Sequence, residues 1–270
     1  MDGLKLIASG GYGKIFATAQ DTIIKAFRKQ ISPEDALNEF KFQEIIYSSI
    51  NKLLSSESDD AIVNLVRKYV VVSKPLDHKM EPVTINSVDY SCYFEMEKLH
   101  GFPLSMYKNF NSQVDANIDK KYLETHNQYL NILLHLSFNL ETTSGFYSVD
   151  YKNPISESNP MRGYFISKDD PNILQYLREN FNLELSDINL KHIIGFLFSW
   201  IYYDTKIIPF DVEIALGFNP DTQQFQINLL DFGLVKHGCE SSLESEMELD
   251  MYADIDDPDI QLGWNCAKQQ

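Results

Sequence analysis

The chain has 270 residues and is 44% hydrophobic, with 17 Phe and 15 Tyr, as expected of a folded protein with one large domain or two modest lobes. Its formal net charge of −16 repels phosphate-rich surfaces, so we expect no nucleic-acid partner and no binding to anionic membranes. The three cysteines lack metal-ligand spacing, no signal peptide is evident, and the longest apolar run, 193–203, is too short to span a bilayer. We therefore expect an intracellular, cytoplasmic protein, with the nucleus as the alternative compartment.

Three short strands are predicted over residues 4–27, and a glycine-rich segment separates the first from the second. Gly10, Gly11 and Gly13 in this segment would let the backbone lie directly against phosphate groups. The alternative is a glycine-rich hairpin turn with no ligand.

A helix follows the third strand. Ser32 is a good N-cap, Pro33 suits the first helical position, and the apolar spacing continues to about Leu54. Lys25, in the apolar strand before it, needs a carboxylate or an anion to offset its desolvation. At about 100° per residue, Glu39 falls on the apolar stripe of the helix and Glu44 falls off it, so we expect a Lys25–Glu39 ion pair. The alternatives are an edge-strand lysine that reaches solvent and a helix rotated to expose Glu39.

The middle of the chain is predicted to be mostly helical, with helices over 122–140, 172–181 and 187–203. A hairpin is then predicted from strands at 211–218 and 225–230, around the turn-forming residues 219–222. Residues 239–259 contain no basic residue and are expected to be partly disordered. Removal of 241–270 should leave the fold largely intact, unless Leu262 and Trp264 dock as an apolar anchor.

Three acidic residues in or directly after the strands of this predicted hairpin are candidate site residues. Asp231 ends an apolar strand and precedes Phe232 and Gly233, a position suited to holding Mg²⁺. Strand alternation places Asp211 and Glu213 on the same face. The alternatives are a surface turn for Asp231 and an ordinary strand with two exposed acids for Asp211 and Glu213.

In this order, the glycine segment, the lysine strand, the acidic strand and the sequence Leu-Leu-Asp-Phe-Gly at 229–233 resemble the protein-kinase-like superfamily. The sequence Asp-Val-Glu-Ile-Ala-Leu-Gly at 211–217 resembles more specifically an uncharacterised, mostly fungal kinase-like domain family with a DVEFVLG-type motif. Further short segments similar to that family lie at 36–40, 161–164 and 198–200. The resemblance covers about residues 8–235 and implies an α+β, two-lobed protein-kinase-like fold of minimal or atypical type. It implies an N-lobe at 1–98 with an antiparallel sheet, a mostly helical C-lobe at 99–238 and an acidic tail at 239–270.

The resemblance also implies ATP and Mg²⁺ as cofactors. It assigns the phosphates to the three glycines and Lys25, the adenine to the backbone near Glu97 and Leu99, and the metal to Asp231 and Glu213. It leaves Asp211 as the catalytic base, because Ile208 stands five residues before Glu213 and cannot accept a proton.

Three functions remain open on the sequence alone. The first is an ATP/Mg²⁺-dependent phosphotransferase whose acceptor is an unknown small molecule or protein. The second is a pseudokinase-like nucleotide-binding interaction module without catalysis. The third is an unrelated α+β scaffold with accidental motifs.

Overall fold

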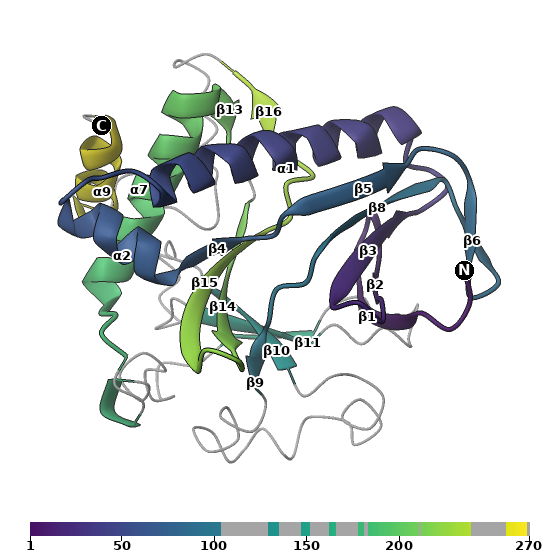
Figure 1. Ribbon diagram of the computed structural model, residues 1–270, viewed down its shortest axis with the longest axis horizontal. Coiled ribbons are helices and arrows are strands. Elements are labelled where there is room, and N and C mark those ends of the chain that lie inside the picture. The colour runs from purple at the N-terminus through teal and green to yellow at the C-terminus, as the bar shows by residue number, and fades with distance from the viewer. Residues whose placement is uncertain are drawn as a thin grey trace.

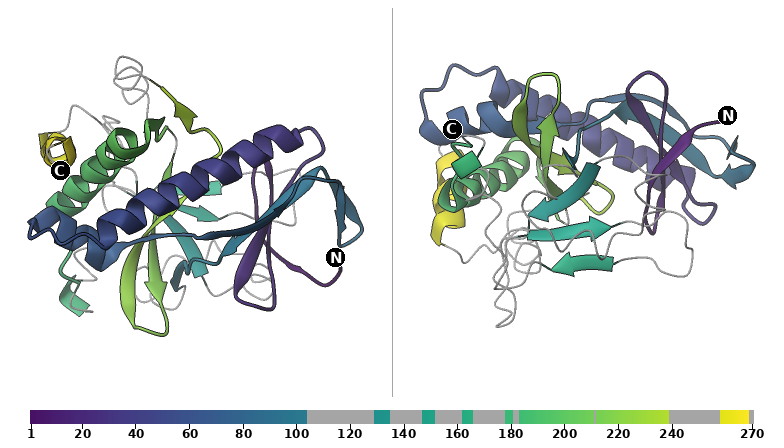
Figure 2. Two further views of the ribbon diagram at one scale, coloured as in Figure 1. Left: turned by 45° about the horizontal axis from the view of Figure 1, so that its top comes forward. Right: turned by 90° about the horizontal axis from the view of Figure 1, so that it is seen from below.

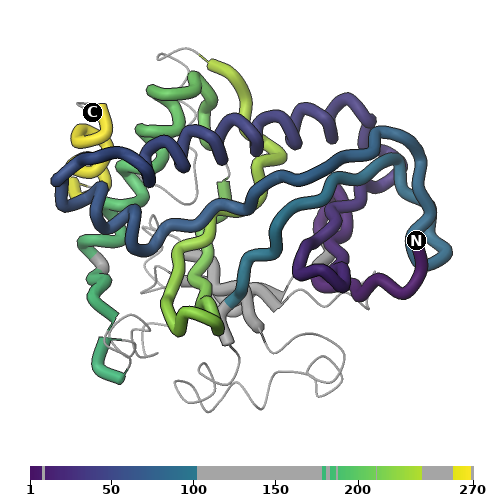
Figure 3. Tube along the Cα trace, viewed as in Figure 1, coloured from purple at the N-terminus to yellow at the C-terminus, as the bar shows by residue number. Residues whose placement is uncertain are grey.

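The computed structural model describes residues 1–103, 129–134, 147–151, 162–165, 178–180, 183–210, 212–238 and 258–268. Within these residues the chain has an α+β fold with two larger sheets and several helices (Figure 1). The N-terminal strands lie at one end of the long axis and the C-terminal helix lies at the other (Figure 3).

The first sheet is antiparallel and has the strand order β1-β2-β3-β8-β5. Its strands are β1 (Lys5–Ser9), β2 (Gly13–Ala17), β3 (Thr22–Phe27), β8 (Cys92–Glu97) and β5 (Pro75–Lys79). The three strands expected over residues 4–27 are therefore present. A small hairpin of β6 (Val83–Ile85) and β7 (Val88–Tyr90) extends from the loop between β5 and β8.

The two faces of β3 contact different parts of the protein, because side chains alternate along a strand. Ile24 and Ala26 pack in a cluster with Ile85 and Tyr90 of the small hairpin. Phe27, two residues after Lys25, packs in a second cluster, with Ala36 and Phe40 among its members. Lys25 consequently projects toward the helix and not toward the hairpin.

That helix, α1 (Pro33–Leu54), has the predicted boundaries. The Ser32 hydroxyl accepts a hydrogen bond from the Asp35 amide at 3.0 Å, so the N-cap forms as expected. The helix runs from the first sheet toward the opposite end of the molecule, as Figure 2 shows. The residues of α1 that are buried are Ala36, Glu39, Phe40, Gln43, Ile46, Ser49, Ile50 and Leu53.

A short stretch of chain then connects the two sheets. Helix α2 (Ala61–Tyr69) is capped by Asp60 and leads into β4 (Val70–Val72), which pairs in parallel with a strand of the second sheet. After Ser73 and Lys74 the chain enters β5 of the first sheet. The sheets are therefore joined through consecutive strands and not only through packing.

The second sheet has the order β12-β11-β10-β14-β15-β4, with β9 (Phe102–Pro103) pairing to β10. Strands β14 (Glu213–Asn219) and β15 (Gln224–Leu230) form the predicted hairpin. The remaining strands are β10 (Tyr129–Leu134), β11 (Tyr147–Tyr151) and β12 (Arg162–Phe165). The sequence predicts that the second half of the chain is mostly helical, whereas the structure has this extensive sheet there.

The helix predicted over 122–140 is wrong where the structure describes it, because residues 129–134 form β10. By its periodicity, this six-residue segment fits a buried strand as well as a helix. Its pairing with β11 on one side and β14 on the other determines that it is a strand. Of the helix expected over 172–181, residues 178–180 are helical and the rest lies outside the described residues.

The main core surrounds α7 (Asp187–Thr205), the helix predicted over 187–203. It takes side chains from α1, from α2 and from strands β4, β14 and β15 of the second sheet. Another helix, α9 (Pro258–Lys268), lies against α7 (Figure 1). It buries Ile260 and Ala267, and Trp264 packs against the main core, as expected of an anchor, whereas Leu262 is exposed. Of the segment expected to be partly disordered, 239–257 lies outside the described residues.

Candidate functional site

A cleft lies between the first sheet, α1 and the end of the β14–β15 hairpin, and it contains about 1040 Å³ of empty space, open solvent at its mouth included. Apolar side chains from both sheets form much of its wall, and polar groups gather at one end. Its lining residues are Ile7, Gly10, Gly11, Tyr12, Gly13, Ile15, Ile23, Lys25, Glu39, Gln43, Ser73, Met96, Leu99, Glu213, Leu229, Leu230, Asp231 and Phe232.

The three glycines of the β1–β2 turn all line the cleft, but for different reasons. A Cβ atom at Gly13 would lie 2.4 Å from the Ala26 carbonyl oxygen, so close packing within the sheet requires this glycine. A Cβ atom at Gly10 or Gly11 would meet nothing within 4 Å. Packing within the described protein therefore does not explain these two glycines, whereas close approach of a ligand to the backbone would.

Arg28 stabilises the turn from outside the cleft lining. Its guanidinium donates to the Gly10 carbonyl oxygen from Nε at 3.3 Å and from Nη2 at 3.2 Å, and its amide donates to the Tyr12 carbonyl oxygen at 2.9 Å. The Gly10 amide donates to the Gly13 carbonyl oxygen at 2.9 Å. These bonds fix the turn in one conformation above the cleft.

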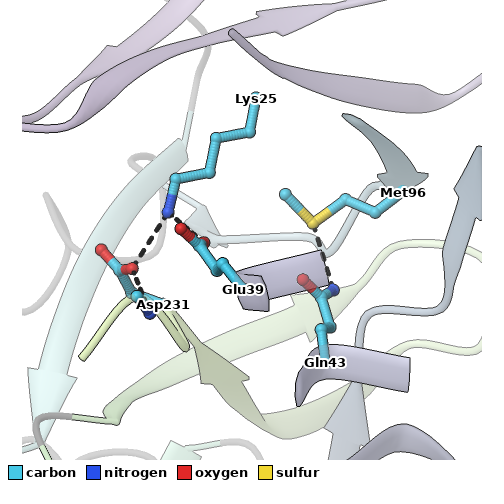
Figure 4. Close-up of polar contacts among 6 residues, drawn as sticks. Lys25, Glu39, Gln43, Met96 and Asp231 are labelled. Atoms are coloured by element: carbon cyan, nitrogen blue, oxygen red, sulfur yellow. Dashed lines mark hydrogen bonds and ion pairs between the residues drawn. The ribbon is translucent and has the colours of Figure 1, made fainter. Parts of the chain in front are cut away.

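The ion pair expected between Lys25 and Glu39 is present, with 2.5 Å between Lys25 Nζ and Glu39 Oε1 (Figure 4). Both side chains are over 90% buried, and Glu44 is exposed on another face of α1. The phase of the apolar stripe therefore identified the correct carboxylate. Lys25 makes a second contact that the sequence did not indicate, at 3.0 Å to Asp231 Oδ1.

Asp231 lies directly after β15, as predicted, and its carboxylate is about half exposed to the cleft, with 49% of the side chain accessible. Its backbone adopts a left-handed conformation with φ of 51°, which turns the chain sharply at the strand end. The Gly233 amide donates to Asp231 Oδ1 at 3.3 Å, and Phe232 is buried in the main core. The buried phenyl ring and the turn together hold the carboxylate at the cleft.

The cluster contains one cation, Lys25, and two carboxylates, Glu39 and Asp231. Burial by itself would lower the pKa of Lys25, but the charges of Glu39 and Asp231 outweigh it and raise the pKa above its ordinary value. Burial raises the pKa of Glu39; Lys25 opposes this shift and the nearby Asp231 charge adds to it. The cluster thus keeps Lys25 charged and carries an excess of negative charge on the side that faces the cleft.

Leu99 also lines the cleft, and its backbone groups make no hydrogen bond with another described residue. Glu97, by contrast, does not line the cleft: its amide donates to the Lys74 carbonyl oxygen at 2.9 Å, and its carbonyl oxygen accepts from the Ser73 hydroxyl at 2.5 Å. Of the two residues predicted here, Leu99 lines the cleft and Glu97 does not.

Sequence reasoning missed a polar group at the back of the cleft. The Gln43 amide nitrogen donates to the Ser73 carbonyl oxygen at 3.0 Å and contacts Met96 Sδ at 3.3 Å (Figure 4). Gln43 is only 3% exposed. Its position four residues after Glu39, on the same helical face, is a signal that could have identified it.

The acidic strand is placed only in part. Glu213, the first residue of β14, lines the cleft together with Asp231, and Asp211 lies outside the described residues. Ile208 is fully buried in β13 (Ile207–Ile208), which pairs with β16 (Lys236–His237). Asp231 and Glu213 could supply oxygen ligands to a divalent cation, the ligand type that Mg²⁺ prefers.

Among the described residues, no group of three or more His, Cys, Asp and Glu side chains has an arrangement that could hold a metal ion. Within the same ranges, no helix is long and apolar enough to cross a membrane.

No protein-family model matches the sequence, and a comparison with curated proteins finds no match.

Proposed function

We propose that the chain has a minimal or atypical protein-kinase-like, two-lobed fold, binds ATP with Mg²⁺ in this cleft, and transfers the terminal phosphate to a small molecule or a protein. The observation that carries the proposal is the cluster in which Lys25 contacts Glu39 from α1 and Asp231 from the end of β15. Lys25 and Asp231 are 206 positions apart in the sequence. They meet in the same cleft as Gly10 and Gly11, where a Cβ atom would meet nothing within 4 Å.

Each part of the cleft suits one part of the nucleotide. The open space beside the Cα atoms of Gly10 and Gly11 and the charge of Lys25 suit the phosphates. The backbone groups of Leu99, which bond to no other described residue and lie beside apolar side chains, suit a flat heterocycle that both donates and accepts hydrogen bonds. Bound Mg²⁺ would neutralise phosphate charge, and Asp231 and Glu213 are the carboxylates that would hold it.

Phosphoryl transfer also needs a group that orients the acceptor. Asp211 remains the residue proposed for this role, because Ile208 is fully buried between α7 and the rest of the core and has no proton-accepting atom. If the chain is an enzyme, Asp211→Ala should abolish turnover with a panel of acceptors and leave nucleotide affinity unchanged.

The buried Ile208 also supports a second candidate function, a pseudokinase-like module that binds nucleotide without catalysis. Under this alternative the nucleotide would stabilise an interaction surface, and Asp211→Ala would alter neither affinity nor any phosphorylated product. Absence of turnover in a protein that binds Mg-ATP would favour this candidate over the phosphotransferase.

The test of binding is the thermal stability of the full chain with increasing Mg-ATP. A ligand at about 100 times its dissociation constant adds about 2.7 kcal/mol to the free energy of unfolding. Asp231→Asn should reduce this ligand-induced shift, measured against its own ligand-free baseline, because a metal ligand is weakened. The matched control is Asp221→Asn on the exposed turn of the same hairpin, which should retain the full shift. No shift with millimolar Mg-ATP would refute both candidates.

A further inference from the structure

A polar junction joins α1 to α7 far from the cleft. The Ser49 hydroxyl donates to Asp204 Oδ2 at 2.7 Å and accepts from Trp200 Nε1 at 3.0 Å. Lys52 Nζ pairs with Asp204 Oδ1 at 2.6 Å and lies 5.9 Å from the centre of a Trp200 ring. We call these four residues, Ser49, Lys52, Trp200 and Asp204, the α1–α7 junction.

The junction is partly buried and its charges are matched. Ser49 is 4% exposed and the Asp204 side chain is 22% exposed, whereas Lys52 reaches solvent. Burial by itself would raise the pKa of Asp204, but the hydrogen bonds from Lys52 and Ser49 outweigh it and the pKa is lowered. Asp204 is thus an ionised acceptor that both donors of α1 contact at once.

The junction is connected to the cleft along α1. Glu39, Gln43 and Ser49 are all buried residues of the same continuous helix. Ten residues separate Ser49 from Glu39, which is about 15 Å of helix. A shift or rotation of α1 at the junction therefore moves the carboxylate that contacts Lys25.

The junction is also connected to the cleft through the end of α7. Helix α7 ends at Thr205, and Lys206 turns the chain with a left-handed φ of 62°. The short strand β13 follows, and Glu213 begins β14 nine residues after Asp204. The junction is therefore where the helix that carries Glu39 meets the segment that leads to Glu213.

We propose that Asp204 is a positioning residue: it fixes α1 relative to α7 and thereby sets the place of Glu39 against Lys25 in the cleft. Its importance for ligand affinity rests on the proposed nucleotide-binding function, but its effect on the Lys25–Glu39 pair does not. Because coupling between two sites is reciprocal, a ligand bound in the cleft would in turn affect the α1–α7 junction.

A double-mutant cycle in the full chain without ligand tests the effect on the ion pair. Asp204→Asn and Glu39→Gln are made singly and together, and the unfolding equilibrium constant of each variant is measured in urea. If Asp204 positions α1, Glu39→Gln should cost less in the Asp204→Asn background, by about fivefold in the equilibrium constant. Equal costs in the two backgrounds would overturn the proposal, since distant independent sites are additive. Ser49→Ala replaces Asp204→Asn in the cycle if the latter does not fold.

Two serines of similar burial provide a matched comparison for the ligand. Ser49→Ala removes the hydroxyl that joins α1 to Asp204, and Ser199→Ala removes a buried hydroxyl on α7 that donates to the Trp264 carbonyl oxygen of α9 at 2.9 Å. Both should lower the melting temperature. Only Ser49→Ala should weaken Mg-ATP binding, by about fivefold. Equal affinities for the two variants would contradict the proposal.

Fluorescence gives a reading that general destabilisation does not produce. The chain has 2 Trp residues, so Trp264→Phe leaves Trp200 at the junction as the single reporter. In that background Glu39→Gln should change Trp200 emission under fully native conditions without ligand, and unchanged emission would count against coupling along α1. If Mg-ATP binds none of these proteins, the proposed function fails, and the cycle and this measurement still decide the role of Asp204.

Discussion

Helices α1 and α9 both pack against α7, but they contact it in opposite ways. α1 contacts α7 through the side chains of the junction, where hydrogen bonds and an ion pair set the distance. α9 contacts it backbone to backbone: a Cβ atom at Gly195 would lie 2.0 Å from the Ile260 carbonyl oxygen, and one at Gly263 would lie 2.0 Å from the His192 carbonyl oxygen. The α1 contact therefore depends on which polar side chains are present, whereas the α9 contact depends on the absence of side chains at two glycines. The cleft is connected to α7 through the first kind of contact.

The largest effect that this comparison predicts is at the cleft end of α1. Lys25→Met leaves the buried Glu39 carboxylate beside Asp231 without a cation, which should destabilise the fold by about 3–5 kcal/mol. The double variant Lys25→Met/Glu39→Gln should recover part of that loss, because it removes the uncompensated charge. Denaturant unfolding measures both. The control is Lys29→Met, which removes an exposed lysine and should change stability little; similar losses for Lys25→Met and Lys29→Met would show that the buried pair is not needed.

The α9 contact should respond to added volume instead. Gly263→Ala forces a methyl group against the backbone of α7 and should cost about 1–3 kcal/mol by overpacking, despite the better helix propensity of alanine. Asn265→Ala on the exposed side of α9 has a somewhat smaller propensity gain without the clash and should be neutral or slightly stabilising. If Gly263→Ala raises the melting temperature as Asn265→Ala does, the close approach of the two helices is not present in solution.

A smaller effect is expected where α9 meets α2. Asp60 Oδ1 accepts from the Ile62 amide at 2.7 Å and the Val63 amide at 3.3 Å, and Asp60 Oδ2 accepts from the Cys266 thiol at 3.3 Å. Asp60→Ala removes the N-cap and should cost about 0.5–2 kcal/mol. Asp60→Asn keeps a capping oxygen and should retain most of that stability in thermal unfolding. Equal losses from the two substitutions would assign the effect to charge and not to capping.

The smallest effect concerns the thiol itself. Burial, together with the hydrogen bond to Asp60, raises the pKa of Cys266 from its ordinary value of 9.0 to about 11. Because the folded-state pKa is the higher one, the stabilising contribution is complete below pH 9.0 and is lost as the pH rises through about 11. Cys266→Ala should cost about 1 kcal/mol or less at pH 7 and should unfold with a weaker pH dependence between pH 9 and 11 than the parent. An unchanged pH profile would show that this thiol is not the group that titrates.

Local signals in the sequence predicted one of these helices and not the other. α1 was predictable because Ser32 and Pro33 mark its start and its apolar stripe gives its phase, and that phase also selected Glu39 over Glu44. The face of α9 that packs on α7 contains Gly263 and Ala267, whose small side chains give no hydrophobic pattern. Their role depends on where another backbone lies.

The same distinction holds in the cleft. Strand alternation and helix phase place Lys25 and Glu39, and the end of an apolar strand places Asp231, so these residues could be found without the structure. The sequence indicates a helix over 129–134 where the structure has a strand, because the periodicity of this segment is ambiguous and only its partners β11 and β14 decide it. The orientation of the Glu97 peptide groups is likewise fixed by hydrogen bonds to Ser73 and Lys74, which are distant in sequence.

Those bonds have a mechanical consequence. The chain passes between the sheets at 73–74 and again, in the opposite direction, at 98–101. The two crossings are held side by side because the Ser73 hydroxyl donates to the Glu97 carbonyl oxygen and the Glu97 amide donates to the Lys74 carbonyl oxygen. Two crossings joined in this way resist sliding of one sheet past the other and leave bending at the crossings as the easier motion. We expect thermal opening and closing of the cleft to occur as a hinge at these two crossings, so that probes placed across the mouth change their separation while a pair of probes placed on the two crossings keeps its separation.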